Sequence, residues 1–138
     1  MKTLFLGITM MGIFLAANCQ ESNMGNGTVS ILRSTGFGAS LRKFANFIDG
    51  EKICKLKNKR FVQYELVPGN YEFAIQMGGK KLKRKTASMA LSVAPKGNYY
   101  LEVDKKNGFI SVKTSLAETT KAIAEDFMAD QKKAVCVD

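Results

Sequence analysis

The sequence predicts a mainly β protein, an antiparallel β-sandwich of about eight strands followed by one C-terminal amphipathic α-helix. Short apolar or alternating segments are separated by turn residues at roughly ten-residue intervals, which is typical of such sandwiches. After residue 115 the apolar spacing changes to a helical period. The chain has 138 residues, of which 46% are hydrophobic, and this suits one domain with a modest core.

The N-terminal segment predicts export from the cytoplasm. Lys2 precedes an uncharged apolar run over residues 4–17, which has the length of a signal-peptide core and is short for a membrane span of about 20 residues. The following segment, LAANCQES around Cys19, resembles the lipobox of bacterial lipoproteins, in which the cysteine is acylated. We expect residues 1–18 to be a lipoprotein-type signal peptide, Cys19 to carry the lipid, and residues 19–27 to form a flexible tether. Ordinary cleavage after Cys19, giving a soluble periplasmic or secreted protein, is the alternative.

Turn residues divide the predicted sandwich, which together with the helix occupies residues 28–138. Asp49-Gly50 lies between two strand-like segments and is a strong hairpin signal, and Pro68-Gly69-Asn70 ends another strand. The segment that follows places Tyr71, Phe73, Ile75 and Met77 on one face. The expected strands cover residues 28–32, 44–48, 51–56, 60–67, 71–77, 87–93, 99–103 and 109–113.

A helix is expected from about Leu116 to Ala134. Ser115 and Glu118 have the spacing of a capping box, in which the two residues satisfy the first free backbone N–H groups of a helix. An apolar stripe that includes Ile123 and Phe127 recurs at helical spacing, so the helix is expected to pack on the sheet.

Two cysteines remain once Cys19 is assigned to lipid attachment. Cys54 and Cys136 form a candidate disulfide, because the predicted compartment is oxidising. Two small buried thiols are the alternative.

Positive charge is concentrated in the middle of the chain. The whole sequence has 21 Lys and Arg against 12 Asp and Glu, a formal net charge of +9. Residues 42–85 alone hold 12 basic and 4 acidic residues, whereas residues 86–138 balance at 7 and 7. A basic run at the tip of a predicted hairpin is the candidate anion-binding site, and a solvated loop is the alternative. The candidate residues are Lys80, Lys81, Lys83, Arg84 and Lys85.

The absence of histidine removes the commonest general base and the commonest metal ligand. The glycines of Gly36-Phe37-Gly38 lack the Lys-Ser/Thr of a phosphate-binding loop, and Asp49 and Glu51 flank a tight turn where both are expected to be exposed. We therefore expect no catalytic residue, no metal site and no cofactor. Nucleic acid is not an expected partner, since the chain begins with an export signal and the basic run has no interleaved aromatic residues.

Four segments resemble an uncharacterised bacterial envelope lipoprotein domain and, more widely, the PEGA-type surface modules. The segments are Ile31-Leu32-Arg33, Phe47 to Glu51, Glu65 to Tyr71 and Gly97 to Val103. The resemblance implies a small β-sandwich with a following helix and supplies no catalytic residue.

Together these features predict a non-catalytic, lipid-anchored protein of the bacterial cell envelope. Its basic face would bind an anionic lipid, a glycan or an acidic protein, and the N-terminal lipid would bind the membrane. The alternatives are a secreted periplasmic inhibitor that presents residues 34–40 or the basic run to an enzyme, and an enzyme that works without histidine.

Overall fold

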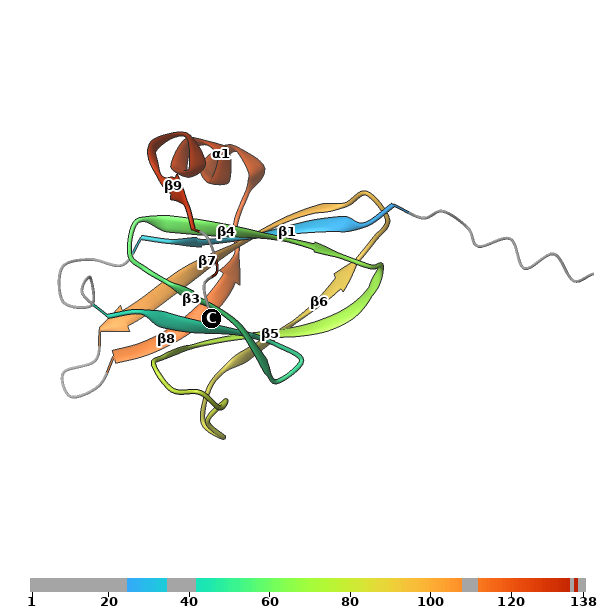
Figure 1. The fold of residues 1–138 in the computed structure, drawn as a ribbon. Helices are drawn as coiled ribbons and strands as arrows, with labels where there is room; N and C mark the ends of the chain where they lie inside the picture. The colour runs from blue at the N-terminus through green and yellow to red at the C-terminus, as the bar shows by residue number, and fades with distance from the viewer. Residues whose placement is uncertain (1–24, 35–41, 108–111, 135, 137–138) are drawn as a thin grey trace, which may run out of the picture.

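The computed structural model describes residues 25–34, 42–107, 112–134 and 136, and it is mainly β with one helix near the C-terminus (Figure 1). The predicted signal peptide, Cys19, most of the predicted tether and residues 35–41 of the glycine-containing loop lie outside the described residues.

Two mostly antiparallel sheets form the body of the protein. The first sheet has the order β8-β7-β1-β4-β9, and the second has the order β3-β2-β5-β6. In the first sheet, β1 is parallel to β7 and β4 is parallel to β9, whereas the other neighbours are antiparallel. The strands are β1 (Gly27–Arg33), β2 (Phe44–Ile48), β3 (Glu51–Leu56), β4 (Arg60–Leu66), β5 (Gly69–Met77), β6 (Ser88–Val93), β7 (Asn98–Asn107), β8 (Val112–Glu118) and β9 (Lys132–Lys133).

The two sheets share one apolar core. Val29 and Leu101 from the first sheet and Phe44 and Phe73 from the second are all fully buried in it. The predicted alternation of β5 is confirmed, because Tyr71, Phe73, Ile75 and Met77 all contact this core. Along one side the core is closed by β8, which contacts both β5 and β6 of the other sheet.

The hairpin predicted at Asp49-Gly50 is confirmed. Both residues have positive φ angles, +50° and +78°, and they join β2 to β3, which pair in antiparallel register. A two-residue hairpin of this kind needs positive φ at both positions, which Asp tolerates and Gly adopts freely.

The helix begins later than the sequence predicts. Ser115 and Glu118 do not form a capping box but belong to β8, where Leu116 pairs with Val103 and Leu116 contacts the main core. The hydrogen bonds between β7 and β8 already satisfy the backbone groups that a helix cap would serve, so these residues form a strand despite the local capping pattern. Helix α1 spans Lys121–Asp130, and the hydroxyl oxygen of Thr120 accepts a hydrogen bond from the Ile123 N–H.

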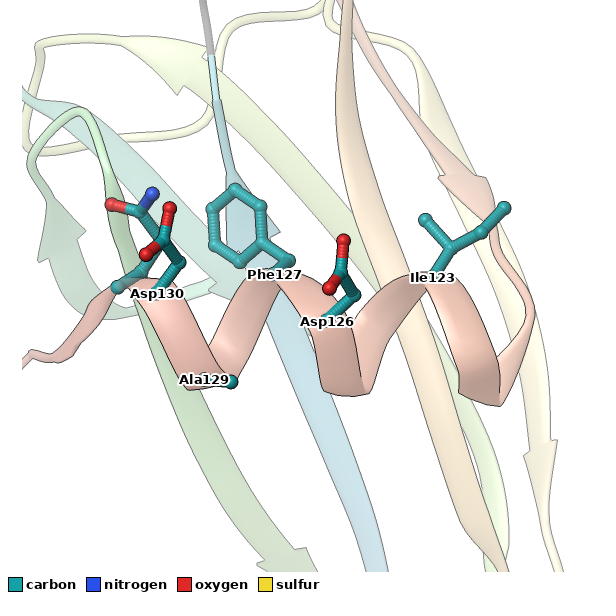
Figure 2. A pocket seen from close by; sticks show the side chains of 6 residues that line it. Ile123, Asp126, Phe127, Ala129 and Asp130 are labelled. Carbon is teal, nitrogen blue, oxygen red and sulfur yellow. The ribbon is translucent and has the colours of Figure 1, made fainter.

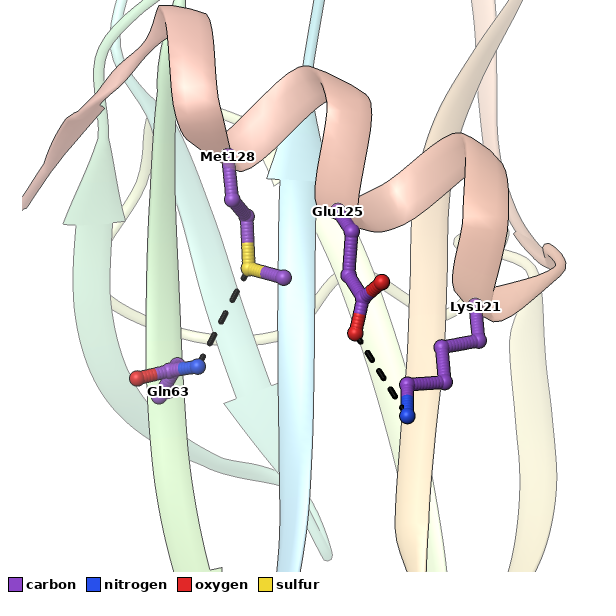
Figure 3. Close-up of polar contacts among 4 residues, drawn as sticks. All are labelled: Gln63, Lys121, Glu125 and Met128. Atoms are coloured by element: carbon purple, nitrogen blue, oxygen red, sulfur yellow. Dashed lines mark hydrogen bonds and ion pairs between the residues drawn. The ribbon is translucent and has the colours of Figure 1, made fainter.

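Helix α1 packs on the outer face of the first sheet, as expected, but only part of the predicted stripe faces the sheet: Phe127 packs there and Ile123 does not. Ala124 is fully buried there and lies in one cluster with Leu32 and Phe61, whereas Ile123 is 57% exposed. Ile123, Phe127 and two carboxylates line a shallow hollow along the helix (Figure 2). The Gln63 side-chain amide donates to the Met128 sulphur at 3.9 Å (Figure 3), a weak contact between β4 and the helix.

A disulfide joins the two sheets at the side where β3 and β4 lie. Cys54 is on β3, an edge strand of the second sheet, and Cys136 follows β9, an edge strand of the first. Their Cα atoms are 5.1 Å apart, and they are separated by 82 positions in the sequence. In the chain-entropy model a cross-link across a loop of this length stabilises the fold by roughly 4.5 kcal/mol.

Replacing both cysteines, Cys54→Ser with Cys136→Ser, should lower the free energy of unfolding by about 2–5 kcal/mol, because the unfolded chain regains the freedom that the cross-link removes. Urea unfolding monitored by circular dichroism measures the difference. The reduced wild-type protein serves as the control and should unfold at nearly the same urea concentration as the variant. A loss below about 1 kcal/mol would contradict this role.

One buried polar pair interrupts the apolar core. Asn46 on β2 is fully buried, and neither of its amide atoms nor the Tyr64 hydroxyl on β4 makes a hydrogen bond of normal geometry. Burial raises the pKa of Tyr64 to about 12, and the nearby Asn46 amide opposes this only in part. A buried hydroxyl without a well-formed hydrogen bond costs stability, since it has exchanged water for an apolar surrounding.

Tyr64→Phe should therefore raise the free energy of unfolding at neutral pH by about 0.5–1 kcal/mol. The variant should also lose less stability at high pH. In the wild type, the Tyr64 phenol ionises near pH 10 in the unfolded chain but only near pH 12 in the folded protein. The folded state therefore loses stability as the pH rises from 10 to 12, by at most about 2.7 kcal/mol. Urea titrations from pH 8 to 12 on both proteins isolate this difference. Equal pH dependence of the two would refute the assignment.

Candidate functional site

The strand register brings three basic segments to one end of the protein. In the second sheet, Phe44 at the start of β2 pairs with Leu56 at the end of β3 and with Met77 at the end of β5. The segment before β2, the β3–β4 turn and the start of the β5–β6 connection therefore lie at the same end, toward the left of Figure 1, and the rest of that connection folds below β5 at the bottom of the view. We call it the basic end.

The charges of residues 42–85 are separated by this arrangement. The four carboxylates of this stretch, from Asp49 to Glu72, lie toward the opposite end, as does Lys52. The other eleven cationic residues lie at or next to the basic end: Arg42, Lys43, Lys55, Lys57, Lys59, Arg60, Lys80, Lys81, Lys83, Arg84 and Lys85. A separation of this kind produces a strong positive potential at one end of the molecule.

The predicted anion-binding residues all lie in the connection between β5 and β6, residues 78–87, which we call the basic loop. All five cationic side chains are exposed. The loop is not a plain hairpin tip, because it folds around the side chain of Gln76, which is 5% exposed.

The Gln76 amide holds the basic loop through four hydrogen bonds. Its nitrogen donates to the carbonyl oxygens of Gly78 and Lys81, at 3.0 and 2.8 Å. Its oxygen accepts from the Lys83 backbone N–H at 2.9 Å and from the Thr86 hydroxyl at 3.0 Å. All donors and acceptors of the amide are thus used, and the loop backbone is fixed at both ends of the basic run.

Leu82 attaches the same loop to the outer face of the second sheet. It lies in the middle of the basic run and packs against the buried side chains of Ala45, Phe47 and Ala74. Those three side chains point away from the main core, so the loop covers apolar surface that water would otherwise meet. A hollow of about 420 Å³ beside the loop is lined by Gln76, by four loop residues that include Lys83 and Lys85, and by one further residue each of β5 and β8.

Arg33 is a buried cation behind the basic end. Its side chain is fully buried, its guanidinium lies 3.8 Å from the centre of the Phe44 ring, and its Nη1 donates to the Leu56 carbonyl oxygen at 2.5 Å. Burial lowers the pKa of Arg33 to about 10, so the group stays protonated at neutral pH. The ring contact and the hydrogen bond offset part of the cost of removing this charge from water.

Sequence reasoning missed the roles of Gln76 and Arg33. Strand alternation placed Gln76 on the face opposite Ile75 and Met77, which is correct, but the loop that buries it there leaves no local signal. Arg33 follows an apolar strand segment, and from the sequence it indicates only where that strand ends.

Two neighbouring tyrosines of β7 lie on opposite faces of the first sheet. Tyr99 packs against the main core, and Tyr100 packs against the cluster under the helix.

Within the residues that the structure describes, no group of three or more Cys, Asp or Glu side chains is arranged to hold a metal ion. In the same residues, no helix has the length and apolar character needed to cross a membrane.

No protein-family model matches the chain, and neither the curated proteins nor the solved structures contain a significant match to it.

Proposed function

We propose that the protein is a non-catalytic binding module of the bacterial cell envelope, anchored by lipid on Cys19, in which two sheets packed as a β-sandwich present the basic end to an anionic partner. The observation that carries this proposal is the concentration of cationic side chains at one end, with the basic loop fixed by Gln76 and Leu82. A fixed array of like charges loses little conformational entropy when it binds, which favours binding over simple solvation.

The position of the N-terminus supports a particular orientation of this module. The chain enters β1 at Gly27, at the end of the sheets opposite Arg33 and the basic end (Figure 1). Seven residues of β1 separate the two ends by roughly 23 Å at about 3.3 Å per residue. A lipid on Cys19 would attach the Gly27 end to the bilayer through the short tether, so on average the basic end would be the end farther from the bilayer. An anionic polymer of the envelope, such as a carboxylated glycan, fits that orientation better than the headgroups of the anchoring membrane.

The charge reversals Lys81→Glu, Lys83→Glu and Arg84→Glu, made together, should weaken binding to a carboxylated polysaccharide at least about tenfold at low salt. Polygalacturonate is a suitable probe, and the intact protein in a neutral detergent is titrated by fluorescence anisotropy. The matched control reverses Lys52, Lys96 and Lys121, which changes the net charge equally but away from the basic end. Equal weakening by both sets would show that only net charge matters and would overturn the site. If phosphatidylglycerol added to the micelles displaces polygalacturonate, the natural ligand of the basic loop is instead a lipid headgroup.

Gln76→Leu tests whether the shape of the basic loop matters apart from its charge. The variant keeps every lysine and arginine but removes four hydrogen bonds, each worth about 1 kcal/mol. We expect weaker polysaccharide binding and faster proteolysis within residues 78–87, with the rest of the fold retained by circular dichroism. If the loop becomes more susceptible to proteolysis but the affinity for polysaccharide is unchanged, a flexible charged segment is sufficient for binding and the fixed shape of the loop is not needed.

The lipid anchor is tested by mass spectrometry of the mature protein. The expected result is an N-terminal peptide that begins at Cys19 and carries a diacylglycerol mass. A mature N-terminus at Gln20 without lipid would assign the protein to the soluble periplasmic or secreted class. That result would also remove the orientation argument while leaving the basic end in place.

A further inference from the structure

A second basic feature lies at the side of the protein where β3, β4 and β9 meet, and it shares Lys55, Lys57 and Arg60 with the basic end. These segments border an open hollow of about 250 Å³ lined by Lys55, Lys57, Arg60, Lys133 and Ala134. Four of the five lining residues are cationic. We call this hollow the edge cleft, and none of its residues belongs to the basic loop.

The C-terminal segment supplies one side of the edge cleft. Arg60 pairs with Lys132 and Phe61 pairs with Lys133 in parallel register, and the Ala134 N–H donates to the Phe61 carbonyl oxygen at 2.7 Å. Two residues further on, Cys136 is bonded to Cys54 of β3. The pairing of β9 is only two residues long, so the disulfide is the strongest restraint that keeps Lys133 beside Arg60.

Positive charge in the edge cleft is not neutralised by the part of the protein that the structure describes. Among the described residues, one ion pair is found, between Lys121 and Glu125. It lies on helix α1 and involves none of the cleft residues (Figure 3). The buried Arg33 lies opposite Arg60 in the antiparallel register of β1 and β4. Bringing like charges together is unfavourable, and a bound anion would relieve that repulsion.

We propose that the edge cleft binds a compact phosphate-class anion, and that the Cys54–Cys136 disulfide keeps the site assembled. Its volume lies below the 300–1,000 Å³ typical of sites for larger organic ligands. A guanidinium binds phosphate oxygens in a bidentate manner, and lysines add charge without fixed geometry, so Arg60 is the orienting residue. This site is additional to the polymer-binding role of the basic loop and does not depend on it.

The double variant Arg60→Gln with Lys133→Gln should weaken binding of inorganic phosphate at least about tenfold, measured by isothermal titration of the intact oxidised protein in neutral detergent. The matched control is Lys80→Gln with Lys85→Gln, which removes two charges from the basic loop and should leave phosphate binding within about twofold of the wild type. Equal weakening by both pairs, or none by the first, would overturn the proposal.

Two further arms test the disulfide and the source of the phosphate. Reduction of the wild-type protein should lower phosphate affinity to the level of the double variant while circular dichroism stays that of a folded β protein. Full affinity after reduction would refute the role of the disulfide. Phosphatidic acid in the micelles should compete with inorganic phosphate if the natural ligand is a lipid monoester, and its failure to compete would assign the cleft to a soluble phosphate compound.

Discussion

The register of β2 between β3 and β5 is the constraint on which the other features of this protein depend. It aligns the ends of three strands in one row, with Leu56, Phe44 and Met77 side by side. A shift of one residue in either pairing would exchange the two faces of the strand, so that core residues such as Phe44 would leave the core. The register is therefore fixed by burial, and the collection of basic segments at one end follows from it.

The basic loop shows how an uncompensated run of charge can be part of a folded structure. Its cationic groups remain in water, so their desolvation costs little, while Gln76 and Leu82 beneath them supply the hydrogen bonds and apolar contact that hold the backbone. Repulsion between neighbouring lysines opposes this conformation, and the four hydrogen bonds of one amide offset it. Loop shape and charge density are consequently set by different residues, which can vary separately.

Much of the fold could be predicted from local patterns. The Asp49-Gly50 hairpin and the inward face of β5 depend on turn chemistry and strand alternation, which act over a few residues. The predicted start of the helix was wrong, because the capping pattern at Ser115 competes with a long-range pairing to β7 that no local pattern reveals. The basic run was evident from composition, but its relation to Lys55, Arg60 and the C-terminal lysines requires the three-dimensional register.

The central position of β1 has a mechanical consequence. This strand lies between β4 and β7, and it begins at Gly27, at the end opposite the basic end. A pull between a membrane anchor and a ligand on the basic end would run along β1. Ladder hydrogen bonds are nearly perpendicular to antiparallel strands and slanted in parallel ones, so this load would shear the bonds on both sides of β1 together and not open them one at a time. A lipid anchor on Cys19 would thus pull on the strand best placed to resist tension.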